Sequence, residues 1–150
     1  MRISLPLAVL LSALTVPAYA TSFDDKLPNQ QSMDALEQRA SVSQPREQCF
    51  LYAQLVHEMI EASAHQYASG DVEKATGLLK RAQEFTHKIH MALASNDKKL
   101  KDAQILLRHT AFRLTELLHS SASEDRPVVQ ATLSQLNEAQ TEAMLQVFKK

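Results

Sequence analysis

The 150-residue sequence predicts an all-α protein in which four long helices form an up-down antiparallel bundle, preceded by a short N-terminal helix. Glycine occurs twice and no proline lies between Pro45 and Pro127, so helix-breaking residues are rare over most of the chain. Apolar residues recur there at three- and four-residue spacing, the period of a helix with one buried face. The breaks between segments are short, which favours antiparallel neighbours with coiled-coil-like packing. We therefore expect one helical-bundle domain over residues 32–150.

The segment 49–67 is the expected centre of the bundle. Its core-facing stripe consists of Cys49, Ala53, Val56, Ile60, Ala64 and Tyr67. Further apolar residues flank the stripe on both sides, so the apolar arc is wider than a surface helix needs. The helix must then be covered from more than one direction. We expect it to begin near Pro45, because proline is tolerated in a first helical turn, and to end near Ala68.

A short helix is expected before it, after a loose lead-in over residues 21–31. Ser32 is a suitable N-cap, and apolar residues then repeat at helical spacing at Met33, Leu36 and Ala40. The residues before Pro45 end this helix, because proline disfavours helix in the residue that precedes it.

Three further helices are expected over residues 72–94, over residues 98–120 and from about residue 126 to the end. Gly70 suits a left-handed helix end and Asp71 an N-cap. Ser121 and Glu124 have the spacing of a capping box. The residues expected to face inward are Ala75, Leu78, Leu79, Ala82, Phe85, Ile89, Leu93, Leu100, Ala103, Leu107, Thr110, Ala111, Leu114, Leu117, Leu118, Val129, Thr132, Leu133, Leu136, Ala139, Ala143 and Val147.

Residues 1–20 have the three-part pattern of a secretory signal peptide. Arg2 supplies a positive end, an apolar stretch follows, and residues 18–20 read Ala-Tyr-Ala, a cleavage site of the A-x-A type. The alternative, an N-terminal membrane anchor, needs a longer apolar stretch. We therefore expect an exported protein of the bacterial periplasm or the extracellular space, with no transmembrane segment in the mature chain.

Charge and cysteine content limit the partners and the chemistry. Of the 16 Lys and Arg residues one, Arg2, lies in the signal segment, which leaves 15 against 17 Asp and Glu, a formal charge of −2. Nucleic acid favours basic faces and is not an expected partner. Cys49 is the only cysteine, so no intrachain disulfide can form. We expect Cys49 to be a small buried apolar residue, with an intermolecular disulfide or a reactive thiol as the alternative.

Two stretches resemble known proteins. Residues 67–82, YASGDVEKATGLLKRA, resemble the helix-turn-helix junction of tetratricopeptide repeats, but no 34-residue period returns. The junction then represents a common way to build a tight helical hairpin. The stretches CFLYAQLVHEM and EDRPVVQATL together are similar to small exported bacterial helical proteins of no assigned activity. That resemblance implies an all-helical fold and export, and it implies no site residue.

His57 and Glu61 are the candidate metal ligands. Residues 57–61, HEMIE, begin like the zinc-protease helix H-E-x-x-H, but the last position is glutamate. The simpler interpretation is a half-buried His57 hydrogen-bonded to Glu61. Two E-x-x-H motifs on consecutive helices, at residues 84–87 and 116–119, invite comparison with di-iron bundles, but their Glu and His residues are expected on solvent faces. A haem site is equally unfavoured, because C-x-x-C-H is absent and no histidine is clearly inward.

An outward apolar stripe is the candidate partner surface. Ile105, His109 and Phe112 share the side of their helix opposite the expected core. Exposed Ile and Phe one to two turns apart are unusual on a free surface. Met91 on the preceding helix and Leu145 and Phe148 on the last helix also point outward. The alternative is that the short N-terminal helix lies over one of these patches and covers it.

The expected function is an exported helical-bundle interaction or scaffold module without catalytic residues. No G-x-S-x-G nucleophile motif and no phosphate-binding glycine loop is present. No cofactor is expected, and the partner is another protein or a second copy in a homodimer. The alternative function is a metal-binding or metal-sensing four-helix bundle that uses His57 and Glu61.

Overall fold

The computed structural model describes residues 27–93 and 99–149, and these residues form five helices and no strand. The helices are α1 (Gln30–Val42), α2 (Pro45–Ala68), α3 (Val72–Ala92), α4 (Leu100–Ser120) and α5 (Arg126–Phe148). The all-α prediction is confirmed, and the predicted helix ends agree with these bounds within two residues, except at the start of α1. The predicted signal peptide over residues 1–20 and most of the lead-in lie outside the described residues.

The start of α1 differs from the prediction. Asn29, and not Ser32, is the N-cap: its Oδ1 accepts from the Ser32 backbone N–H at 2.8 Å. The Ser32 hydroxyl oxygen accepts from the Asn29 backbone N–H at 3.2 Å in return. This is a reciprocal capping box with serine in the third helical position. Because asparagine is an equally good cap, the helix gains one more turn at its start than Ser32 would allow.

The turn between α2 and α3 follows the prediction. Gly70 has φ +85°, a left-handed conformation that costs glycine little. The Asp71 carboxylate accepts from the Lys74 backbone N–H at 3.2 Å and so caps α3. The turn between α4 and α5 differs from the prediction. The Ser121 hydroxyl donates to the Leu117 carbonyl at 2.6 Å, and the capping box predicted for Ser121 is absent.

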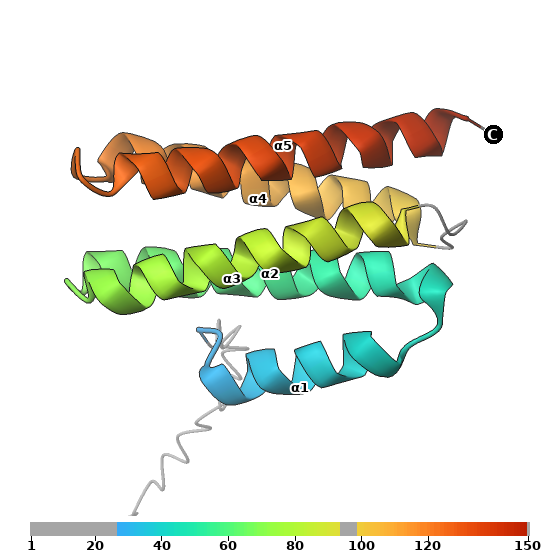
Figure 1. Cartoon of the computed structure of the whole chain (residues 1–150), viewed down its shortest axis with the longest axis horizontal. Coiled ribbons are helices and arrows are strands. Elements are labelled where there is room, and N and C mark those ends of the chain that lie inside the picture. The colour runs from blue at the N-terminus through green and yellow to red at the C-terminus, as the bar shows by residue number, and fades with distance from the viewer. Residues whose placement is uncertain (1–26, 94–98, 150) are drawn as a thin grey trace, which may run out of the picture.

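The helices form two hairpins that stack on each other. α2 packs against α3, α4 packs against α5, and the hairpins meet where α2 lies beside α4 and α3 beside α5. Within the described residues α3 and α4 do not contact each other. In a simple up-down bundle α3 and α4 would be neighbours; here they lie at opposite corners of the bundle (Figure 1).

Side-chain pairs show the relative direction of the stacked helices. His57 and Glu61 of α2 contact Thr110 and Arg113 of α4, so residue numbers rise together along both helices. α2 and α4 therefore run parallel. The same holds for α3 and α5, which are joined by the pairs Gln83–Thr132 and His90–Glu142. The neighbours between the hairpins thus run in the same direction, whereas the sequence predicted an up-down antiparallel bundle.

The core consists of the residues that the helical periodicity placed inward. All the predicted inward positions of α3, α4 and α5 are buried except Leu78, Leu118 and Val147, which are half-buried and pack against the core. The α2 stripe is buried from Cys49 to Ile60. α2 is covered from three sides, by α1, α3 and α4, as its wide apolar arc predicted. Among the described residues no helix is long and apolar enough to cross a membrane.

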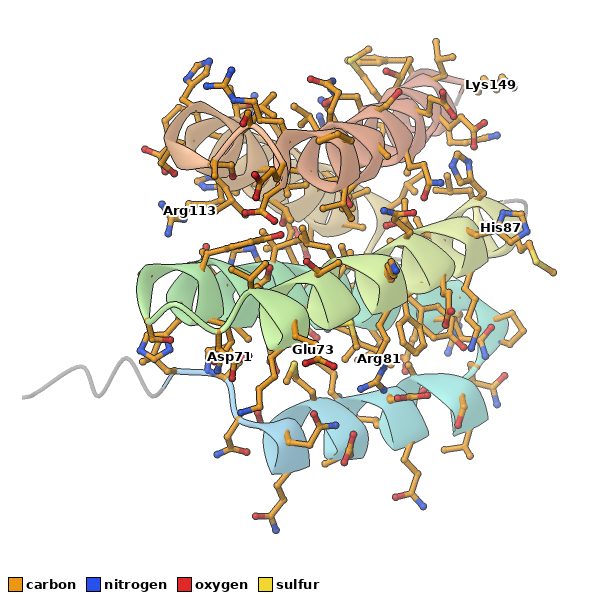
Figure 2. The ribbon with its side chains drawn as sticks, turned by 60° about the vertical axis from the view of Figure 1, so that its left-hand side comes forward. Asp71, Glu73, Arg81, His87, Arg113 and Lys149 are labelled. Atoms are coloured by element: carbon orange, nitrogen blue, oxygen red, sulfur yellow. The ribbon has the colours of Figure 1, made fainter. Side chains whose placement is uncertain are left out.

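α1 covers one face of α2. Leu51, Leu55, Glu58 and Ala62 recur at helical spacing on the side of α2 away from the core stripe. The three apolar members are at most 6% exposed, and α2 is the helix against which α1 packs. One ion pair adds a link to α3: Arg81 reaches Glu37 of α1 at 2.7 Å (Figure 2).

Candidate functional site

His57 and Thr110 form a polar contact where α2 meets α4. The imidazole Nδ1 lies 2.9 Å from the Thr110 hydroxyl oxygen, and that hydroxyl donates its proton to the Leu106 carbonyl at 2.9 Å. A hydroxyl has one proton to donate. The Thr110 oxygen must therefore accept, and Nδ1–H of His57 is the donor. This contact holds a half-buried histidine in one tautomer.

Glu61 does not bond to His57, contrary to the simpler sequence interpretation. Arg113 of α4 takes both carboxylate oxygens, with Nε–Oε1 at 2.8 Å and Nη2–Oε2 at 3.1 Å. Arg113 also pairs with Glu116 one turn further along α4. The fork of a guanidinium matches two carboxylate oxygens at once. Arginine therefore outcompetes the imidazole for Glu61.

Burial lowers the pKa of His57; Glu61 opposes this effect, and the nearby His109 and Arg113 add to it. The imidazole is therefore neutral near pH 7. Within residues 27–93 and 99–149 no group of three His, Cys, Asp or Glu side chains is placed to hold a metal ion. Since Nδ1 of His57 and both oxygens of Glu61 bond to other side chains, the geometry here is that of a structural contact.

The E-x-x-H residues lie on solvent faces. Glu84, His87, Glu116 and His119 are all exposed. The two motifs are carried by α3 and α4, which do not contact each other in the described part of the chain. The inward convergence that a di-metal carboxylate site requires is absent from these four residues.

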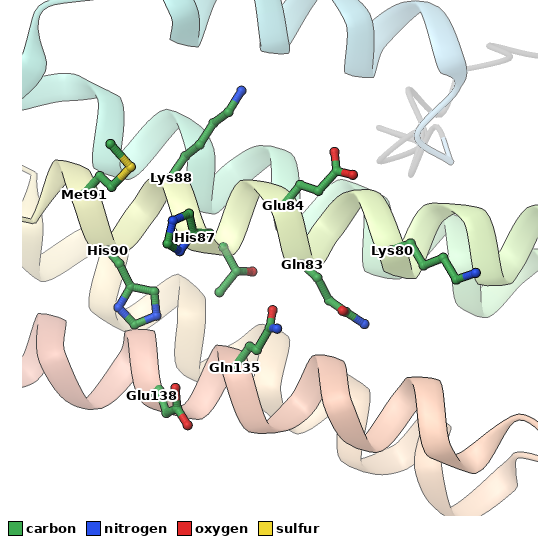
Figure 3. A pocket seen from close by; sticks show the side chains of 10 residues that line it. Lys80, Gln83, Glu84, His87, Lys88, His90, Met91, Gln135 and Glu138 are labelled. Carbon is green, nitrogen blue, oxygen red and sulfur yellow. The ribbon is translucent and has the colours of Figure 1, made fainter.

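A groove of about 730 Å³ runs between α3 and α5, and the sequence did not predict it (Figure 3). Polar side chains of both helices form its walls. The residues that line it are Lys80, Gln83, Glu84, Thr86, His87, Lys88, His90, Met91, Gln135 and Glu138. The groove arises because α3 and α5 are brought together only by the stacking of the hairpins, and no signal in the sequence reports that pairing.

Two polar side chains that point across the groove already have partners on α5. His90 Nδ1 lies 2.5 Å from the Glu142 carboxylate, and Gln83 donates to the Thr132 hydroxyl at 2.9 Å. Figure 3 shows His90 and Gln83 directed toward α5. These contacts join α3 of one hairpin to α5 of the other. No pair of nucleophile and base is assembled among the residues that line the groove.

The outer face of α4 carries the predicted partner surface. Phe112 is 64% exposed, Ile105 is 38% exposed, and His109 is exposed beside them. α1 packs on α2 and does not reach α4. The alternative in which the short N-terminal helix covers this stripe is therefore wrong.

The end of α5 carries further exposed apolar side chains, as the sequence predicted. Leu145 and Phe148 are 54% and 78% exposed, and Met144 joins them. Ile105 lies near the start of α4 and these residues lie near the end of α5, which are the two helix ends away from the α4–α5 connection. The apolar residues of α5 thus lie at the same end of the hairpin as Ile105.

Cys49 is fully buried on the core side of α2, where a small apolar residue is expected. Its burial does not favour a thiol that reacts with solvent or with another protein. No protein-family model, no curated protein and no solved structure matches this chain.

Proposed function

We propose that this protein is an exported helical-bundle interaction module that binds protein through the outer face of α4, with a second copy of the chain as the first partner to test. The observation that carries the proposal is the exposure of Phe112 beside Ile105 on one face that no other helix covers among the described residues. A phenylalanine left in water gives up a burial free energy of roughly 1.5–3 kcal/mol. A partner that covers this face recovers it.

The surroundings of Phe112 support a protein partner. Ile105 lies two turns away on the same face, and Met144 and Leu145 are exposed near the end of the next helix. Apolar patches rimmed by polar residues are typical of protein–protein surfaces. His109 supplies such a polar neighbour. A helix face of this kind is self-complementary in a two-fold dimer, in which each copy presents the same patch.

Export rests on the pattern of residues 1–20. We expect the mature protein to begin at Thr21, after cleavage behind Ala20. Intact-mass measurement of the protein recovered from a bacterial periplasm tests this. A chain that retains residues 1–20 and stays with the membrane would contradict export in soluble form.

The partner surface is tested by the variant in which Ile105 and Phe112 are both replaced by serine. Sedimentation velocity over about 1–500 µM should show a dimer for the wild type and a monomer for the double variant, with unchanged helical circular dichroism. Met91→Ser is the matched control, because Met91 is 70% exposed but lies on α3. A dimer that survives the double substitution, or a wild type that is monomeric throughout, would overturn self-association through α4.

A further inference from the structure

The α2 face beneath α1 contains a carboxylate that α1 does not satisfy. Oε2 of Glu58 is buried, and no hydrogen-bond donor reaches it from the described residues. Burial raises the pKa of Glu58, and hydrogen bonding from Ser32 of α1 offsets part of that effect. A buried acceptor without a partner is costly. α1 therefore covers this face with one polar group mismatched.

The same face is otherwise apolar. Leu51, Leu55 and Ala62 surround Glu58 along α2 and are buried under α1. Together the four residues make a stripe about three turns long, the usual footprint of a helix that docks along another helix. The stripe is apolar except for the carboxylate of Glu58 near its middle.

α1 holds this face through few contacts. It buries Met33 and Ala40 and half-buries Leu36. The Glu37–Arg81 ion pair joins side chains that are each 36% exposed, and such pairs stabilise weakly. Only Ser43 and Gln44 separate the end of α1 from the start of α2. α1 is thus a short helix at the edge of the fold, and α2 is the helix against which it packs.

We propose that the face formed by Leu51, Leu55, Glu58 and Ala62 is a docking site for an amphipathic helix of another protein that carries Lys or Arg in its apolar stripe, and that α1 occupies this face until such a helix displaces it. Charge complementarity selects the occupant: a basic side chain pairs with the Glu58 oxygen that α1 leaves without a donor. The apolar residues beside it bind the rest of the helix as they now bind α1.

The test uses peptides of residues 27–44 added to the full mature chain. One labelled peptide carries Ser32→Lys, which brings an ammonium group to the position that now faces Glu58. The matched control peptide carries Ser32→Ala, because both changes remove the same capping bond to Asn29 and only one adds a charge. Fluorescence anisotropy at pH 7.5 should show about tenfold tighter binding of the lysine peptide.

Two further measurements separate displacement from surface adsorption. Hydrogen exchange of the α1 amides should accelerate when the lysine peptide binds. The preference for lysine should vanish on a chain with Glu58→Gln, which keeps the side-chain shape and removes the charge. A second chain variant, Met33→Ser, should weaken the packing of α1 on α2. It should therefore increase the binding affinity of both peptides by the same factor.

Four outcomes would overturn the proposal. The first is equal affinity of the two peptides for the wild-type chain. The second is a preference for lysine that persists with Glu58→Gln. The third is no binding to the Met33→Ser chain, which would show that the face accepts no helix in trans. An exchange of α1 between two copies, seen as a dimer that excludes the peptide, would assign the face to the chain itself and likewise overturn it.

Discussion

The imidazole Nδ1 of His57 donates to the hydroxyl oxygen of Thr110 across 2.9 Å, and this bond joins two helices that run parallel. The two residues are 53 positions apart in the chain. Together with the Glu61–Arg113 pair one turn further on, the bond fixes how the α2–α3 hairpin stacks on the α4–α5 hairpin. His57 and Glu61, which the sequence suggested as metal ligands, thus contribute to the alignment of α2 with α4.

Thr110→Val tests the contribution of this bond to stability. Valine keeps the shape of threonine but leaves Nδ1–H of His57 without its acceptor, which should lower the free energy of unfolding by about 1 kcal/mol, toward the lower end of the range for half-buried donors. Thr110→Ser keeps the hydroxyl and should cost less than this. Urea denaturation at pH 7.5 measures both. Equal stability of wild type and Thr110→Val would show that the bond contributes nothing.

Stability should fall as the pH drops through the histidine range. The pKa of His57 is lowered in the folded protein, so the unfolded chain takes up its proton first, and the stabilising effect of the neutral form is lost below the unfolded pKa of roughly 6.5. His57→Gln should flatten this dependence between pH 7.5 and pH 5. The measurement is the denaturation midpoint at several pH values. An unchanged slope in His57→Gln would exclude His57 as its source.

Arg113→Ala should raise the pKa of His57. Arg113 lowers that pKa by its own charge, and Glu61 raises it. Removal of Arg113 therefore deletes the lowering effect and also frees the Glu61 carboxylate, so both changes raise the pKa of His57. Arg113→Lys, which retains the charge but not the two-pronged geometry, should shift it less. A ¹H–¹³C NMR titration of the His57 ring follows the change. Identical titration curves in the wild type and both variants would contradict this coupling.

Glu58→Gln should stabilise the protein at neutral pH. The pKa of Glu58 is raised by burial, so the folded state holds the proton more tightly, and stability falls as the pH rises above the unfolded pKa of roughly 4.3. Glutamine removes the charge and therefore this loss. The gain in melting temperature should be present at pH 7.5 and absent at pH 3.5. A gain of the same size at both values would point to a cause other than ionisation.

The two glycines should respond to alanine in opposite directions. Gly70 has φ +85°, which an L-residue adopts with strain, so Gly70→Ala should destabilise by about 1 kcal/mol. Gly77 is exposed inside α3 with nothing within 4 Å of an added Cβ, so Gly77→Ala should stabilise by roughly 0.5–1 kcal/mol. Thermal unfolding compares the pair. The same sign of change at both positions would contradict the role assigned to Gly70.

The sequence by itself determined the helices, their bounds and the residues that face the core. These features depend on local chemistry: the spacing of apolar residues, the scarcity of glycine and proline, and the turn at Gly70 and Asp71. The exception at Ser32 is also local, because two adequate N-caps stand three residues apart and the sequence does not rank them. The exposure of Phe112 followed from the same periodicity.

Only the tertiary structure decided which helices are neighbours, and the polar contacts depend on that choice. Glu61 was expected to bond to His57 on its own helix, yet the stacking of the hairpins brings Arg113 to Glu61 and Thr110 to His57. The burial of Glu58 likewise follows from where α1 packs. Periodicity shows which face of a helix is buried but not by what, because contacts between residues about 50 positions apart carry no signature in either segment alone.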